Sequence, residues 1–241
     1  MRLAYLGNSF IYYNDLPATL QALHPNRIDG SSVALRGGAS LTSLAAKGAR
    51  HPLEGHDQFE SVETLFADER KVDYVIFNDF SQGPARAESR DSTITALEHT
   101  YAPLLATAEA TPVLMATWAY RDPVKGSDDL GDAATFTASL YAGTLMYKAA
   151  LDASLQLKAI VAPVGDAFLL VHDERPSLWA RLFDDDGFHP SKKGTDLAAL
   201  VLTAALWGSL SDSASDERMD DWDDEMMFLW DVALRAVSKY N

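Results

Sequence analysis

The sequence predicts an α/β protein, a three-layer αβα sandwich around a flavodoxin-like, five-stranded parallel sheet with the strand order 2-1-3-4-5. Short apolar runs alternate along the chain with longer segments whose apolar residues recur at helical spacing. The short runs are apolar throughout, which is typical of strands that helices cover on both faces. Sequential crossovers from a strand close to the N-terminus make this strand order the economical one.

The elements are expected in an alternating order. The five strands are Leu3–Leu6, Val33–Leu35, Tyr74–Phe77, Pro112–Thr117 and Ala159–Ala162. The helices lie around Leu16–Leu23 and Phe59–Arg70, over Thr93–Ala110 and Ala133–Gln156, and over Ser191–Trp207 and Glu217–Lys239. The acidic segment Ser209–Asp221 is expected to be a loop before the final helix, whose apolar stripe includes Leu229 and Ala233.

Composition narrows the class of protein. The chain has 241 residues, of which 47% are hydrophobic and 23% are charged, and no stretch rich in Gly, Ser or Pro divides it, so one domain over residues 1–241 is expected. It has no cysteine, which excludes disulfides, a thiolate nucleophile and zinc–thiolate sites. The net charge of −15 disfavours binding to nucleic acid or anionic membranes. No apolar run is long enough for a membrane span or a signal peptide, so we expect a soluble, cytoplasmic protein.

Residues with site-forming chemistry follow the predicted strands. Ser9, Gly38, Asn78, Gln82 and Trp118 each come shortly after a strand. Because ligands of parallel sheets bind beyond the carboxyl ends of the strands, we expect these residues to gather along one rim.

Two motifs at opposite ends of the chain match the parts of one hydrolase site. Gly7-Asn8-Ser9-Phe10 follows the first strand, and Asp186-Gly187-Phe188-His189-Pro190-Ser191 precedes the helix Ser191–Trp207. A serine hydroxyl needs an adjacent base to act as a nucleophile, and an aspartate three residues before a histidine can orient the imidazole. Ser9 could instead cap a helix, and the acidic turn ending at Asp186 could be solvated; we expect no metal there.

These motifs resemble those of the SGNH (GDSL-like) hydrolase superfamily, over Gly7 to about Trp207. Further blocks resemble a less-studied branch of it: Asn8 to Pro17, Gly37 to Leu41, Phe80 to Pro84, and Ala162 to Ala167 as the lead-in to the final loop. Two departures are visible. Asn8 replaces the usual aspartate of the first block, and the Gly-x-Asn-Asp string of the third block is missing.

The resemblance implies a role for each matching residue. Ser9, His189 and Asp186 would be the catalytic triad. The backbone N–H groups of Ser9 and Gly38 would form the oxyanion hole with a side-chain amide, for which alignment by strand start favours Gln82 over Asn78. The residues expected to line the substrate pocket are Tyr12, Asn14, Trp118 and Tyr120, although the last two could also belong to a packed loop.

The predicted function is that of a serine esterase without metal or organic cofactor. Its substrate would be a small-molecule or carbohydrate ester of a small acyl group, most naturally acetyl. A thioesterase or lysophospholipase activity on the same site is the alternative chemistry. A non-catalytic SGNH-like carbohydrate-binding protein is an alternative of another class. A flavin- or nucleotide-binding module is disfavoured, because the first strand is followed by Gly7-Asn8-Ser9 without a basic residue or a Gly-rich phosphate cradle.

Overall fold

The structure, a computed structural model, describes residues 1–122, 124, 126–155, 158–209 and 222–240. Its centre is a parallel sheet of six strands in the order β3-β2-β1-β4-β5-β6. The strands are β1 Arg2–Gly7, β2 Gly30–Leu35, β3 Asp57–Gln58, β4 Tyr74–Phe77, β5 Thr111–Met115 and β6 Ile160–Ala162. The predicted α/β class is therefore confirmed, as is the relative order of the five predicted strands.

The prediction of five strands was one strand short. β3 has only two residues and pairs with Ser32 and Val33 at the edge of β2. Both residues of β3, Asp57 and Gln58, are polar, and neither is buried. Such a strand has no apolar run by which a sequence pattern could reveal it.

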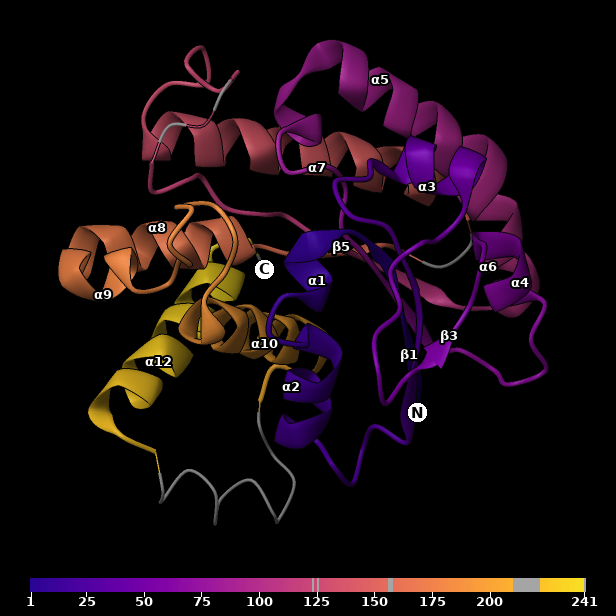
Figure 1. The fold of residues 1–241 in the computed structure, drawn as a ribbon, viewed down its shortest axis with the longest axis horizontal. Coiled ribbons are helices and arrows are strands. Elements are labelled where there is room, and N and C mark those ends of the chain that lie inside the picture. The colour runs from indigo at the N-terminus through magenta and orange to yellow at the C-terminus, as the bar shows by residue number, and fades with distance from the viewer. Residues whose placement is uncertain (123, 125, 156–157, 210–221, 241) are drawn as a thin grey trace.

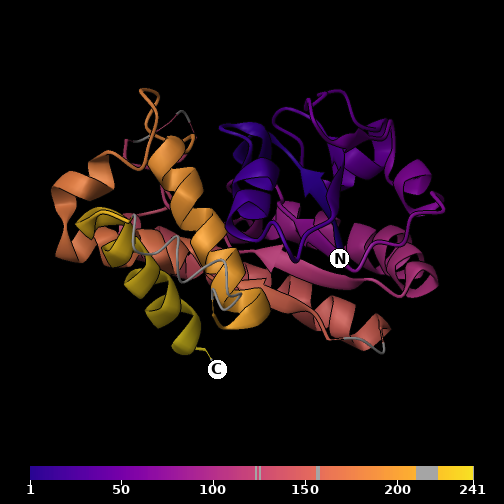
Figure 2. The same cartoon turned by 90° about the horizontal axis from the view of Figure 1, so that it is seen from below.

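Helices cover both faces of the sheet (Figure 1). On one face lie α3, α4, α5, α6 and α7, and on the other lie α2, α8, α10 and α12, with α12 alongside α10 (Figure 2). The described helical segments are α1 Ser9–Tyr12, α2 Leu16–Leu23, α3 Leu41–Lys47, α4 Val62–Phe66, the 3₁₀ helix η1 Gly83–Ala85, α5 Ala87–Ala96, the π-helical η2 Leu97–Tyr101, α6 Ala102–Ala108, α7 Ala133–Ser154, α8 Val164–Glu174, α9 Pro176–Ala180, α10 Lys192–Trp207 and α12 Asp224–Ser238. None of them combines the length and apolarity that crossing a bilayer requires.

Alternate residues of the strands other than β3 enter two hydrophobic clusters, one on each face of the sheet. Tyr5 and Ile76 belong to the cluster under α2, α8, α10 and α12, and Leu6 and Phe77 belong to the cluster under α3 to α7. All four are at most 1% exposed. Burial on both faces explains why these strands are apolar throughout.

Several helices differ from the sequence-based expectation. The segment from Val164 begins the helix α8, whereas the sequence suggested a lead-in to a loop. Gly165 lies so close to the segment after β5 that an added Cβ would be 2.1 Å from the carbonyl oxygen of Thr117, so this glycine permits the close packing of α8 against that segment. The expected helix Phe59–Arg70 shortens to α4, and Thr93–Ala110 is the later part of a helical stretch that begins at Ala87. Residues 210–221 of the expected loop lie outside the described residues.

Candidate active site

The turns that carry the predicted site residues lie side by side at the carboxyl edge of the sheet. Leu6 of β1 is in register with Ala34 of β2 and with Phe77 of β4. The turn after β1 therefore lies between the turn after β2 and the turn after β4. This arrangement brings the segments that hold Ser9, Gly38 and Asn78 to one rim, as the sequence predicted.

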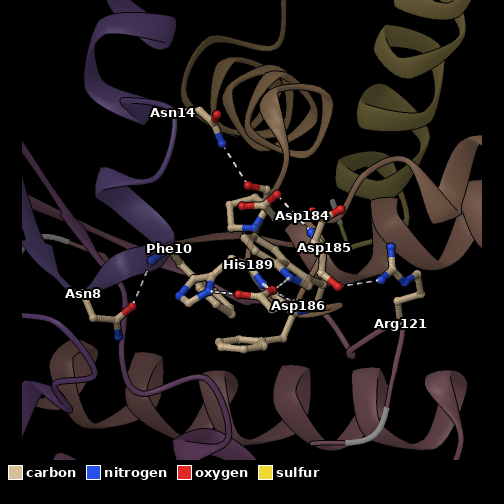
Figure 3. Close-up of polar contacts among 11 residues, drawn as sticks. Asn8, Phe10, Asn14, Arg121, Asp184, Asp185, Asp186 and His189 are labelled. Atoms are coloured by element: carbon tan, nitrogen blue, oxygen red, sulfur yellow. Dashed lines mark hydrogen bonds and ion pairs between the residues drawn. The ribbon is translucent and has the colours of Figure 1, made fainter.

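Asn8 holds the turn after β1 in place. Its side-chain oxygen accepts a hydrogen bond from the backbone N–H of Phe10 at 3.2 Å and thereby caps α1. Its amide nitrogen donates to the carbonyl oxygens of Ala39 and Asp79, both at 2.9 Å (Figure 3 shows the Asn8–Phe10 contact). Because Asn8 is the cap, Ser9 is the first residue of α1 and its hydroxyl has no capping role.

Asp79 is an anchor that the sequence reasoning did not identify. Its carboxylate accepts hydrogen bonds from the backbone N–H of Leu41 at 2.8 Å and from the hydroxyl of Tyr147 at 2.6 Å. Burial raises the pKa of Asp79, although these hydrogen bonds oppose the rise. It joins the start of α3 to α7 beneath the rim. The sequence feature that could have pointed to Asp79 is the pair Asn78-Asp79, which directly follows the buried strand β4.

Asp186 and His189 form a hydrogen-bonded pair on the loop before α10 (Figure 3). The distance from Asp186 Oδ2 to His189 Nδ1 is 2.6 Å. The other carboxylate oxygen accepts the backbone N–H groups of Phe188 at 3.1 Å and His189 at 2.9 Å. Burial alone would raise the pKa of Asp186, but the hydrogen bonds from His189 and Phe188 outweigh it and lower this pKa below its ordinary value. The carboxylate is therefore ionised at neutral pH and can stabilise an imidazolium.

Neighbouring segments dock this loop through its backbone carbonyls. The Trp118 indole N–H donates to the carbonyl of Phe188 at 3.0 Å, and the Arg121 backbone N–H donates to that of Gly187 at 2.8 Å. On the opposite side, the Asn14 amide donates to the carbonyl of Pro190 at 2.8 Å (Figure 3). The loop is thus tied both to the segment after β5 and to the connection between α1 and α2.

A ring of α1 and a ring of its C-terminal cap residue pack against the imidazole of His189. Tyr13 stacks on His189 with ring centroids 3.9 Å apart and planes 2° apart, and Phe10 meets the imidazole edge-on at 5.8 Å. The His189 side chain is only 12% exposed. Within the described residues, no hydrogen bond joins Ser9 to His189. The Ser9 hydroxyl contacts the Tyr12 phenol, whose pKa burial and Tyr13 raise while this contact lowers it.

The candidate oxyanion-hole residues differ in their surroundings and in the hydrogen bonds they already make. Gly38 has φ +64°, a conformation that favours glycine, with open space around the position of a Cβ. The Gln82 side-chain oxygen accepts a hydrogen bond from Arg86 Nε at 2.8 Å, and its side chain also contacts Tyr120. Asn78 is fully buried, and among the described residues neither its amide nitrogen nor its oxygen has a hydrogen-bond partner. A buried, unpaired amide is costly, so it requires an explanation.

Of the four residues expected to line the pocket, two serve the scaffold instead. Trp118 has no exposed surface and stacks between Phe10 and Phe168, both at 4.5 Å. Asn14 donates a hydrogen bond from its amide to the carbonyl of Pro190 and thus helps to hold the loop before α10 in place. These positions could not be assigned from sequence, because the partners lie far away in the chain.

The other two expected residues lie at surfaces that a ligand can reach. Tyr12 is half-buried and stacks on His51 at 3.6 Å, next to Ser9. Tyr120 lines a cavity beside the loop, and its hydroxyl lies 2.6 Å from that of Ser81.

Comparisons with known proteins find similarity in structure. No family model and no curated protein matches the chain at a significant level. A candidate SGNH hydrolase from Slackia heliotrinireducens is 25% identical, with a TM-score of 0.63, over 86% of this chain and 98% of its own. A DUF4886 family protein from Bacteroides uniformis is 17% identical, with a TM-score of 0.71, over 99% of this chain and 93% of its own. The acetyl xylan esterase AlAXEase is 12% identical, with a TM-score of 0.54, over 86% of this chain and 100% of its own.

The chain has the SGNH hydrolase fold. This fold accounts for the distance in sequence between the two motifs. β1 lies in the interior of the sheet, and the loop before α10 docks beside its carboxyl end. The SGNH fold thereby brings Ser9 and His189, which are 180 positions apart in the chain, to one rim.

Proposed function

We propose that the protein is a serine ester hydrolase in which Ser9 is the nucleophile, His189 the general base and Asp186 the residue that orients and stabilises the imidazole. The hydrogen bond of 2.6 Å between Asp186 and His189, on a loop whose imidazole stacks against the end of the Ser9 helix, carries the proposal. Nδ1 is engaged by Asp186, so Nε2 is the nitrogen that would receive the serine proton.

The reaction would proceed through an acyl-enzyme. Ser9 Oγ attacks the ester carbonyl carbon while its proton passes to His189 Nε2. The resulting oxyanion accepts hydrogen bonds from the N–H groups of Ser9 and Gly38. The imidazolium then gives its proton to the leaving alcohol as the bond to it breaks. In the second half, His189 takes a proton from a water molecule that attacks the acyl carbon; the bond to Ser9 Oγ breaks, the serine takes that proton back, and the acid is released. Asp186 stays ionised throughout, because its pKa is held below the ordinary range.

A side-chain amide would complete the oxyanion hole, and we favour Asn78 over Gln82 for this role. The Gln82 amide group already has Arg86 and Tyr120 as neighbours, whereas the Asn78 amide has no hydrogen-bond partner in the part of the chain that the structure describes. The side chain of Asn78 also starts close to the turn that holds Ser9. A Cβ added to Gly7 would lie 3.0 Å from the Cβ of Asn78. A functional donor explains why a buried amide is left unpaired.

The substrate we propose is an ester of a small acyl group, acetyl above all, on a carbohydrate. The rings of Tyr13, Phe10 and Phe188 crowd the imidazole, which favours a short acyl chain. The net charge of −15 disfavours anionic substrates such as coenzyme A thioesters and anionic lipids. The similarity in fold to an acetyl xylan esterase agrees with this substrate class.

Hydrolysis of p-nitrophenyl acetate and labelling by a serine-directed fluorophosphonate test the proposal together. The wild-type protein should turn over the acetate, and mass spectrometry should locate the phosphonate on Ser9. Ser9→Ala and His189→Ala should each lower turnover by roughly 10⁴-fold or more, and the double variant should be little worse than either. Retention of a tenth of the activity by Ser9→Ala would refute the mechanism. A folded wild-type protein without turnover or adduct would indicate a non-catalytic binding protein.

A further inference from the structure

A cavity of about 410 Å³ lies beside the candidate triad and is not part of it. It is formed by the segment that follows β5, the start of α7 and the helix α9. The residues that give it its chemistry are Tyr120, Arg121, Asp128, Asp132, Phe136 and Trp179. Its volume lies within the range of small-molecule sites, roughly 300–1,000 Å³.

Phe188 connects this cavity to the imidazole. The Phe188 ring lies 4.1 Å from the ring of His189 and 5.8 Å from that of Tyr120. The Tyr120 ring, which lines the cavity, is therefore within about 10 Å of the imidazole. The backbone of Arg121, another lining residue, donates to the carbonyl of Gly187 in the same loop. A molecule of two linked rings could reach from the cavity to an ester at Ser9.

The charges around the cavity favour a neutral ligand. The Arg121 guanidinium donates to the carboxylate of Asp122 at 2.7 Å and to two backbone carbonyls, so its charge is paired. Asp128 and Asp132 add two carboxylates to the lining. Asp132 accepts the N–H of Thr135 as the cap of α7, whereas Asp128 is exposed at the cavity. Such a lining repels phosphates and carboxylates but can accept hydrogen bonds from hydroxyl groups.

The aromatic part of the lining offers one accessible ring. Tyr120 is 9% and Phe136 4% exposed, so they form the floor of the cavity. Trp179 is only partly buried and packs at 5.3 Å against Phe183, which fixes its ring at the wall. A rigid indole presents an apolar face together with a polar edge, which matches a sugar ring with its C–H face and its hydroxyl groups. One accessible ring does not make the aromatic cage that a quaternary ammonium group requires.

We propose that this cavity is a subsite for a neutral sugar unit adjacent to the acetylated one, with Trp179 as the stacking platform and Asp128 as a hydroxyl acceptor. The inference rests on the proposed esterase function and adds to it that the substrate contains at least two linked sugar units. The cavity binds the part of the substrate that leaves with the alcohol.

Steady-state kinetics with two substrates test the subsite. The substrates are p-nitrophenyl acetate, which cannot reach the cavity, and acetylated xylobiose, which can. Trp179→Ala should raise KM for acetylated xylobiose by about tenfold, and Asp128→Ala by a few-fold, with kcat/KM for p-nitrophenyl acetate unchanged. Asp231→Ala is the matched control, because it removes the same charge from the exposed surface of α12 and should change neither substrate's kinetics.

The outcomes separate the subsite from the esterase function. Unchanged KM for acetylated xylobiose in both cavity variants, with normal hydrolysis of p-nitrophenyl acetate, would overturn the subsite alone. A rise in KM for acetylcholine alone in the two cavity variants would overturn the sugar subsite and indicate a cation site. Absence of wild-type activity on p-nitrophenyl acetate would overturn the esterase function and the subsite with it. If Trp179→Ala does not fold, the comparison of Asp128→Ala with Asp231→Ala decides.

Discussion

Replacing Asn8 by aspartate should destabilise the protein, although the two side chains have nearly the same shape. The Asn8 amide nitrogen donates to the carbonyl oxygens of Ala39 and Asp79, both at 2.9 Å, and the residue is only 3% exposed. A carboxylate cannot donate. In Asn8→Asp, two buried carbonyls would lose their partner, and a negatively charged oxygen would face both of them.

The size of the effect follows from these contacts. Leaving a buried acceptor unsatisfied costs about 1–3 kcal/mol, and two acceptors are affected. We expect a loss of roughly 3–5 kcal/mol in the free energy of unfolding at pH 7. Burial among acceptors should raise the pKa of the new carboxyl in the folded state above its unfolded value. The protonated carboxyl can donate once, so the loss should shrink as the pH falls and be largest above the raised pKa.

Urea unfolding followed by circular dichroism measures this loss. Asn14→Asp is the matched control, because Asn14 is exposed and donates at 2.8 Å to one carbonyl, that of Pro190. Its loss should be about 1 kcal/mol. Equal losses in the two variants, or a loss below about 1 kcal/mol in Asn8→Asp, would refute the role assigned to the Asn8 amide.

Two further predictions concern the chemistry of the site. Asn78→Leu should lower turnover of p-nitrophenyl acetate by about 10²–10³-fold, because an oxyanion donor is lost. The free energy of unfolding should stay equal or rise, because the buried amide has no hydrogen-bond partner among the described residues to lose. The same loss of turnover in Gln82→Leu, with full activity in Asn78→Leu, would show that Gln82 is the donor instead. In the wild type, the hydrogen bonds from His189 and Phe188 lower the pKa of Asp186, so this carboxylate should stay ionised, and kcat/KM should be kept, as the pH falls through the range in which an ordinary aspartate is protonated. Asp186→Asn should lower kcat for p-nitrophenyl acetate, because the carboxylate that orients the imidazole and stabilises the imidazolium is lost; an unchanged kcat in this variant would exclude that role of Asp186.

The parts of the fold that could be predicted are those whose signal lies within a few consecutive residues. The strands from β1 to β6, apart from β3, were visible because burial on both faces makes them apolar throughout. The helix α8 was missed because the segment Ala162 to Ala167 was interpreted, by resemblance, as the lead-in to the final loop. The need for glycine at position 165 comes from the approach of its backbone to Thr117, in the segment after β5 and some fifty residues earlier in the chain, and no local pattern carries it.

The same distinction holds for the candidate site. The pairing of Asp186 with His189 was predictable, because a spacing of three residues on a tight loop lets the carboxylate reach Nδ1. The roles of Trp118 and Asn14 were not, because their partners are carbonyls of the loop before α10, which is distant in sequence. An indole or amide that follows a strand looks the same in sequence whether it meets a ligand or a backbone carbonyl.

Three side chains that assemble the rim share one property, which bears on the asparagine in the first block. Asn8, Asn14 and Trp118 are neutral donors, and each donates to a backbone carbonyl of another segment. Such bonds do not change with the protonation state of the donor, and salt screens them far less than it screens surface ion pairs. The chain carries a net charge of −15, so its surface potential varies strongly with pH and ionic strength. The bonds from these neutral donors therefore keep their geometry while that potential varies, whereas the carboxylates of Asp79 and Asp186 are ionisable groups on which the rim and the loop before α10 also depend.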